Sequence, residues 1–170
     1  MEAVILVGIQ AAGKSTFYRE RFFDTHLRIS LDMVRTRRRE RLLMEACIEA
    51  GQRFVIDNTN PTVAERARYL APARAAGFRT IGYFFEPDPR GSVARNAGRP
   101  RQVPPGGIFG TLKRLERPTL AEGFDELHSC ASAKAASRSR PGSDPFCCSF
   151  HPPLCLRVKR RLKFWHGARQ

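Results

Sequence analysis

The sequence predicts an α/β protein in which a parallel β-sheet lies between helices on both faces, a three-layer sandwich. Short apolar runs that are typical of buried strands alternate with longer helical segments along the first 128 residues, and this alternation indicates a parallel sheet. Charged residues of chemical interest follow several of these runs directly. Because open parallel sheets bind ligands at the carboxyl ends of their strands, the position of these residues agrees with the predicted fold.

The N-terminal part is expected to begin with a strand. Residues 3–7 form a continuous apolar run, which is typical of a buried parallel strand. A helix is expected over about 14–23 and a short strand over 27–30. The aspartate at the start of 32–50 is expected to cap a long helix, which stops at Gly51.

The middle of the chain repeats this pattern. A further strand of the buried type is expected over 53–57. Asn60 suits an N-cap and Pro61 suits the first helical position, so a helix is expected from there to about residue 76. The next apolar run predicts a strand over 79–85.

The last elements are shorter. The Asp-Pro pair at the start of 88–96 opens a helix. Residues 98–107 contain three Gly, three Pro and two Arg, which predicts a mobile loop. A helix over 108–117 and a short strand over 124–127 are expected to complete one folded domain at 1–128.

Charge and composition change after residue 128. The chain has a formal net charge of +14, and residues 129–170 carry more than half of that excess. Turn-forming and disorder-prone residues dominate 131–145, so 129–170 is predicted to be a basic tail of low order. The positive charge favours anionic partners such as nucleotides and nucleic acid, with a solvated tail as the alternative.

The sequence indicates a cytoplasmic protein with no membrane partner. It has no apolar run of about 18 residues, and its N-terminus lacks the basic region and the long apolar run of a signal peptide. Cys47 is the only cysteine before residue 128, which fits a reducing compartment. The tail cysteines lack the spacing of a zinc site, and the pattern carries no signal for an oligomeric state.

Residues 8–15, GIQAAGKS, match the phosphate-binding P-loop pattern G-x-x-x-x-G-K-[ST] at every fixed position. The two glycines allow the backbone to fold around phosphate oxygens, and N–H groups at the start of the next helix supply positive potential. Lys14 would reach the β- and γ-phosphates of ATP, and the Ser15 hydroxyl would bind Mg²⁺. A plain glycine-rich turn is the alternative. The predicted nucleotide-binding residues are Gly8, Ile9, Gln10, Ala11, Ala12, Gly13, Lys14, Ser15 and Thr16.

The P-loop predicts a fold of the P-loop NTPase or kinase type, and the remaining sequence favours a small kinase. A P-loop alone does not separate kinases from ATPases or GTPases. The sequence has no Asn-Lys-x-Asp element for guanine, and ring ATPases with arginine fingers need a larger module than 170 residues usually hold. A kinase domain at 1–128 that transfers the γ-phosphate of ATP to a hydroxyl is therefore expected.

Residues after the second predicted strand are candidates for the acceptor side of the site. Asp32 could accept the proton of the attacking hydroxyl, or it could simply cap the helix. Arg35 could hold a phosphate or the acceptor, or it could be solvated. Some side chains of the surrounding basic stretch are expected to track an anionic polymer and others to face water. That stretch comprises Arg35, Arg37, Arg38, Arg39 and Arg41.

Three further residues indicate metal binding and a lid. Asp57 ends a predicted strand, where an acid supports Mg²⁺ directly or through water, and an Asx turn is the alternative. Arg95 and Arg99 are four residues apart on the helix that enters the Gly/Pro loop, so they are expected to share a face. They suit a lid that closes on the transferring phosphoryl group, and surface arginines are the alternative.

Six segments occur together and in a fixed order: Gly8–Phe17, Asp32-x-x-Arg35, Val55–Pro61, Glu65–Gly77, Ala94-Arg95 with Arg99, and Arg117–Phe124. In this order they resemble the kinase domain of polynucleotide 5′-hydroxyl kinases, which include the phosphatase-coupled DNA and RNA repair enzymes. The resemblance covers about residues 3–127. VIDNTNP and PTLAEGF are more specific than the P-loop, because generic P-loop kinases lack them.

The resemblance implies roles for individual residues. Asp32 would be the general base, Arg35 would contact a phosphate of the acceptor, and Asp57 is the acid that ends its strand. Arg99, together with Arg95, would stabilise the transition state from the lid. The implied reaction converts ATP and a 5′-OH nucleic acid end into ADP and a 5′-phosphate end. The alternatives are transfer to a small-molecule or protein hydroxyl, and a non-catalytic ATP-binding module.

Overall fold

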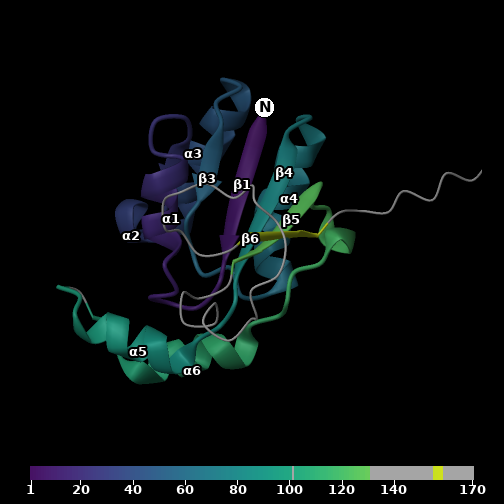
Figure 1. Cartoon of the computed structure of the whole chain (residues 1–170). Helices are drawn as coiled ribbons and strands as arrows, with labels where there is room; N and C mark the ends of the chain where they lie inside the picture. Colours follow the sequence, from purple (N-terminus) through teal and green to yellow (C-terminus); the bar gives the residue numbers. More distant parts are fainter. Residues whose placement is uncertain (101, 131–154, 159–170) are drawn as a thin grey trace, which may run out of the picture.

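Six strands form one sheet in the order β2-β3-β1-β4-β5-β6 (Figure 1). The structure, a computed structural model, describes residues 1–100, 102–130 and 155–158. The first five strands are parallel, and β6 pairs antiparallel to β5. The predicted α/β fold with a parallel sheet is thereby confirmed. The strands are β1 Glu2–Val7, β2 Leu27–Ile29, β3 Phe54–Ile56, β4 Arg79–Phe85, β5 Glu126–Cys130 and β6 Cys155–Val158.

Helices cover both faces of the sheet and complete the three layers. Val4 and Leu6 of β1 pack toward α1, whereas Ala3, Ile5 and Val7 of the same strand pack toward α3 and α4. Burial of alternate residues on opposite faces explains why this strand is apolar throughout. Helices α5 and α6 pack together beyond the end of the sheet to which β1 points (Figure 1). The helices are α1 Lys14–Arg21, α2 Leu31–Val34, α3 Arg37–Glu49, α4 Val63–Ala75, α5 Pro89–Ala97 and α6 Pro105–Arg114, with a 3-10 turn η1 at Leu120–Glu122.

The helix predicted over 32–50 is in fact two helices, α2 and α3. Ser30 caps α2, and its Oγ accepts a hydrogen bond from the backbone N of Asp32 at 3.3 Å. Arg35 then adopts a left-handed conformation with φ 69°, which costs on the order of 1 kcal/mol for a residue with a side chain. Thr36 restarts the helix by capping α3 with its hydroxyl.

Two other predicted helix starts differ from the structure. Helix α4 begins at Val63 with Thr62 as its N-cap, so the predicted cap at Asn60 is wrong. Asn60 is instead buried in a left-handed conformation with φ 47°, and its Nδ2 donates to the Leu6 carbonyl at 2.8 Å. Helix α6 begins at Pro105, inside the segment predicted to be a loop.

The last strands lie later in the chain than predicted. Phe124 was expected to begin a strand, but it is buried just before β5, which runs from Glu126 to Cys130. The predicted boundary at residue 128 falls within this strand, and β6 adds residues 155–158 to the sheet. The other residues of the predicted tail lie outside the described part of the chain. Among the described residues, no helix combines the length and the apolar character needed to cross a lipid bilayer.

Candidate active site

A cleft of about 290 Å³ opens between the P-loop, the start of α2 and the loop after α5. It brings together five residues to which the sequence analysis assigned a chemical role: Lys14, Ser15, Asp32, Asp57 and Arg99. Of the predicted nucleotide-binding residues, 10–15 line the cleft, whereas Gly8, Ile9 and Thr16 do not. The complete lining consists of residues 10–15, Leu31, Asp32, Arg37, Asp57, Asn58, Thr59, Arg99 and Val103.

The P-loop is shaped by two glycines with positive φ. Gly8, with φ 153°, approaches β4 so closely that an added Cβ would lie 3.0 Å from the Phe85 Cβ. Gly13, with φ 101°, occupies the N-cap position of α1. Lys14 is 8% exposed, and its Nζ donates to the carbonyls of Gly8 at 2.8 Å and Ile9 at 2.6 Å. The loop thus curls around its own lysine at a helix N-terminus, which is a favourable site for an anion.

Lys14 is the electrostatic centre of the cleft. Burial lowers the pKa of its ammonium group to about 8, Asp57 and Asp32 oppose this shift, and Arg99 adds to it. The carboxylates of Asp57 and Asp32 and the guanidinium of Arg99 are therefore close enough to Lys14 to change its pKa. A bound polyphosphate would favour the charged lysine and raise its pKa again.

The segments VIDNTNP (55–61) and PTLAEGF (118–124) support the P-loop through hydrogen bonds and an ion pair. The backbone N of Gly8 donates to the Thr59 carbonyl at 3.0 Å. The buried side chain of Arg66 donates to the Asn60 carbonyl at 3.1 Å and forms a bidentate ion pair with Glu122 at 2.6 and 2.9 Å. Both segments therefore fix the position of the phosphate-binding backbone.

Ser15 and Asp57, the predicted magnesium ligands, lie against each other. The Ser15 Oγ donates to the Asp57 Oδ2 at 2.8 Å. Hydroxyl and carboxylate oxygens are donors that Mg²⁺ prefers, and this ion usually takes its other ligands from water and phosphates, so the pair fits it. Among the described residues there is no cluster of three or more His, Cys, Asp or Glu side chains that could hold a metal ion.

Sequence reasoning missed Arg28 at this position. Its guanidinium donates to the Asp57 Oδ2 from Nε at 2.8 Å and from Nη2 at 2.5 Å, and Nη2 also lies 3.2 Å from the Ser15 Oγ. The guanidinium therefore supplies positive charge to the carboxylate that would face the metal. The only signal in the sequence is a lone cation inside a short strand that ends at the site.

The start of α2 places Asp32 at the cleft. Because Ser30 provides the cap, the interpretation of Asp32 as an N-cap is wrong. The Asn58 Oδ1 accepts a hydrogen bond from the backbone N of Leu31 at 2.9 Å and ties this turn to the loop after β3. The Asp32 carboxylate is thus held beside the phosphate-binding loop without serving as a cap.

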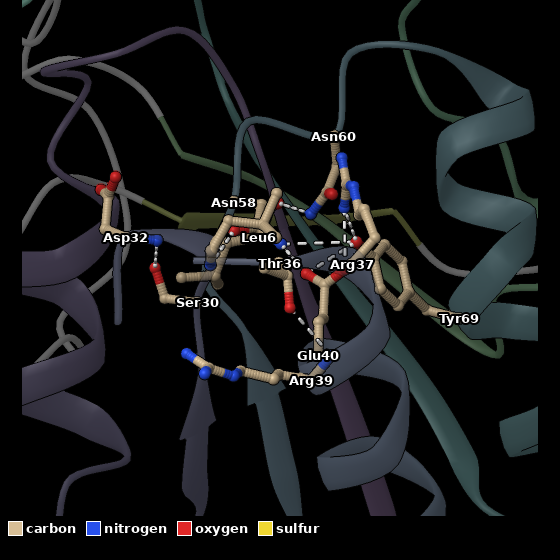
Figure 2. A network of polar contacts seen from close by, with 11 residues as sticks. Leu6, Ser30, Asp32, Thr36, Arg37, Arg39, Glu40, Asn58, Asn60 and Tyr69 are labelled. Carbon is tan, nitrogen blue, oxygen red and sulfur yellow. Dashed lines mark hydrogen bonds and ion pairs between the residues drawn. The ribbon is translucent and has the colours of Figure 1, made fainter. Parts of the chain in front are cut away.

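A polar network lies at the same cleft as Asp32 (Figure 2) and consists of Arg37, Glu40, Asn58 and Tyr69. Glu40, 3% exposed, accepts hydrogen bonds from Arg37 Nη1 at 2.8 Å and Asn58 Nδ2 at 2.5 Å. The Tyr69 hydroxyl donates to Glu40 at 3.1 Å and accepts from Arg37 Nη1 at 2.7 Å. Burial and the neighbouring Glu40 carboxylate raise the pKa of Tyr69 to about 12. The network holds the Arg37 guanidinium at the edge of the cleft.

Arg37 lines the cleft, whereas Arg35, the predicted contact for the acceptor, does not. The positive φ of Arg35 ends α2 and directs the chain into the new helix. Arg37 becomes the first residue of α3 as a result. The signal that could have found it is the N-cap preference of Thr36 directly before it.

The two arginines that were predicted to form a lid, Arg95 and Arg99, lie in different positions. Helix α5 ends before Arg99, so Arg95 and Arg99 do not share a helical face as predicted. Arg99 lines the cleft, whereas the Nε of Arg95 donates to the Ala11 carbonyl of the P-loop at 2.8 Å. Asn96 closes the loop after α5 through two hydrogen bonds with the Val103 backbone, at 2.8 and 3.0 Å.

Solved structures share this fold. A gluconokinase from Sinorhizobium meliloti is similar with a TM-score of 0.56 and 14% identity, over 78% of this chain and 83% of that chain. Kti12 from Chaetomium thermophilum, in complex with ADP-AlF3, is similar with a TM-score of 0.56 and 15% identity, over 77% of this chain and 89% of that chain. At these identities the likeness shows the fold alone. Sheet order, P-loop and cleft together define a nucleotide-binding domain of the P-loop kinase type.

A match to a protein-family model shows the family of the chain. Residues 4–118 match the AAA domain family AAA_33, and the chain belongs to that family. It is also 27% identical over 135 residues to the bifunctional polynucleotide phosphatase/kinase of Schizosaccharomyces pombe, a distant relationship. This match covers 74% of the chain and 32% of the relative, so the chain spans about a third of that protein's length.

Proposed function

We propose that this chain is an ATP-dependent phosphotransferase that moves the γ-phosphate of ATP onto the 5′-hydroxyl end of a polynucleotide. The observation that carries the proposal is the convergence of a P-loop lysine, a carboxylate and an arginine, Lys14, Asp32 and Arg99, on one cleft. The distant relationship to a polynucleotide phosphatase/kinase supports the choice of acceptor.

In the proposed reaction, each residue has a separate task. The P-loop amides and Lys14 bind the phosphates of ATP. The acceptor oxygen attacks the γ-phosphorus, the bond from that phosphorus to the bridging oxygen breaks, and ADP leaves. Asp32 accepts the proton of the attacking hydroxyl, and Arg99 offsets the charge of the transferring phosphoryl group. Ser15 and Asp57 would hold Mg²⁺, which when bound neutralises charge on the β- and γ-phosphates.

The test is transfer of radiolabelled phosphate from γ-labelled ATP. We expect labelling of a 5′-OH oligonucleotide and none of the same oligonucleotide carrying a 5′-phosphate. Small-molecule alcohols and a protein substrate mixture run in parallel. Labelling of those acceptors alone would show that the polynucleotide assignment is wrong while the phosphotransferase assignment stands.

A pair of variants tests whether the domain is catalytic at all. Asp32→Asn removes the proposed base, and Asp24→Asn changes an exposed aspartate that does not line the cleft. We expect only the first to lower the rate of labelling, by about a hundredfold or more. ATP binding without turnover by the wild-type protein would instead indicate a non-catalytic nucleotide-binding module.

A further inference from the structure

A second hollow, of about 630 Å³, lies between α3 and α4. Its base includes Met44, Tyr69 and Pro72, which are buried or half-buried. Arg37 lines both this hollow and the candidate active site. We call the hollow the arginine groove, and it begins where the acceptor side of the cleft ends.

Arginines from two helices form the rim of the arginine groove: Arg37, Arg38 and Arg41 of α3 and Arg68 of α4. Arg41 follows Arg37 by four residues and Arg38 by three, which are spacings at which helical side chains lie on one face, and Arg37 and Arg38 are adjacent at the start of the helix. Arg35 and Arg39 do not line the groove. The basic stretch therefore divides into a set that borders the groove and a set that does not.

Two of the four rim arginines have no acidic partner. Arg37 is paired with the buried Glu40 at 2.8 Å, and Arg41 lies 3.5 Å from Glu45. Arg38 and Arg68 are exposed, and neither makes an ion pair or hydrogen bond within the described part of the chain. Glu40 and Glu45 also line the groove, where they offset the charges of Arg37 and Arg41. The groove thus combines two uncompensated guanidinium groups with apolar side chains at its base.

We infer that the arginine groove binds the nucleotide units that follow the acceptor nucleotide in a single-stranded nucleic acid. This inference rests on the proposed function, because it places the 5′-OH end in the cleft and the rest of the strand beyond Arg37. Guanidinium groups bind phosphates with matched geometry, and an apolar base accommodates sugar and base surfaces. Grooves that bind single strands combine these same two elements.

The volume and the charge favour this occupant over a small alcohol. A hollow of this size falls in the range of ligand-binding pockets, about 300–1,000 Å³. A small neutral acceptor would fit within the cleft and would carry no anion that could bind Arg38 and Arg68, which line only the groove. A strand with a phosphate at each step supplies the anions that these two side chains lack.

The experiment compares two 5′-OH acceptors, a nucleoside 3′-monophosphate and a short oligonucleotide, with the full chain. We expect a lower KM for the oligonucleotide in the wild-type protein. Arg38→Ala/Arg68→Ala should raise that KM about tenfold and leave kcat and the KM of the mononucleotide unchanged. It should also reduce the slope of log affinity against log salt for the single strand by about 1.4.

The matched control is Arg39→Ala/Arg53→Ala, which removes the same charge from exposed positions outside the groove and the cleft. The Arg39 side chain points away from Arg37 and Tyr69 (Figure 2). Equal effects of the two double variants, or equal effects on both acceptors, would overturn the arginine groove while leaving the kinase assignment intact. Failure of the wild-type protein to phosphorylate either acceptor would instead refute the proposed function, and the groove assignment with it.

Discussion

The two sides of the candidate active site are built in different ways. The phosphate side is one continuous segment, residues 8–15, whose lysine bonds to carbonyls of its own loop. The acceptor side is assembled from separate parts of the chain: Asp32 follows a short strand, Asn58 reaches it from the loop after β3, and Tyr69 contributes from α4.

Because of this difference, we expect side-chain substitutions to have different effects on the two sides of the site. The backbone of this loop is held by two glycines with positive φ and by the bond from Gly8 N to the Thr59 carbonyl, so a side-chain substitution there should remove chemistry rather than structure. A network of side chains loses several contacts when one member is removed. We therefore expect sharp, selective losses on the phosphate side and graded losses in acceptor use on the acceptor side.

The largest effect is expected for Lys14→Ala. The substitution removes the ammonium that is proposed to bind the phosphates of ATP, so turnover should fall at least about a thousandfold. Circular dichroism should show a retained fold, because β1 and the glycines of the loop are unchanged. Lys113→Ala is the matched control, since that lysine is exposed and does not line the cleft. A soluble Lys14→Ala protein with wild-type turnover would show that the phosphate side is wrongly assigned.

Asp32→Asn tests the acceptor side while it keeps the shape of the side chain. Loss of the proton acceptor should lower kcat about a hundredfold or more. The dissociation constant of ATP should stay unchanged, because the bonds of the P-loop do not involve Asp32. The two quantities are measured by steady-state kinetics and by nucleotide titration. A parallel loss of ATP affinity would assign Asp32 to the phosphate side instead.

Much of the phosphate side could be predicted from the sequence, since its determinants are local. The glycine spacing, the apolar run of β1 and the lysine at a helix start are all visible in residues 3–15. The strand β4 was predicted with its observed bounds for the same reason, as a continuous apolar run. Ser15 and Asp57 were each predicted to support Mg²⁺, one from the P-loop motif and one from a strand end, and their side chains lie together in the structure.

The acceptor side could not be predicted to the same depth. Whether 32–50 forms one helix or two depends on the positive φ of Arg35, and propensities give no sign of that conformation in an arginine. The contact of Glu40 with Tyr69 joins residues that are 29 positions apart. Such long-range contacts decide that Arg37, and not Arg35, reaches the cleft.

Arg37→Ala compared with Arg35→Ala tests this correction. Arg37 lines the cleft and is fixed by two hydrogen bonds, so its removal should raise the KM of the acceptor about tenfold, the loss of one charged contact. Arg35→Ala should have a smaller effect on the same KM. The KM of ATP should be unchanged in both variants. A larger effect for Arg35→Ala would restore the role that the resemblance implied for that residue.

The smallest expected effect is the pH dependence of ATP affinity. It tests the phosphate side alone, because it depends on the titration of Lys14. Burial lowers the pKa of Lys14 to about 8, so the free protein loses its ammonium charge above that pH, whereas bound phosphates favour the charged form. ATP affinity should therefore be nearly constant below pH 7 and should fall about threefold between pH 7.5 and 8.5. Calorimetric titration at pH 8 in buffers of different ionisation enthalpy should reveal proton uptake on binding.

Two variants locate the origin of this pH dependence. Lys14→Arg keeps its charge throughout this range and should bind ATP with an affinity that no longer falls above pH 7.5. Asp32→Asn should retain the decline, since the desolvation of Lys14 is the dominant cause of the shift and the Asp32 charge only opposes it. Proton release on binding, or a decline that persists in Lys14→Arg, would place the titrating group elsewhere and remove the lysine from its central position in the cleft.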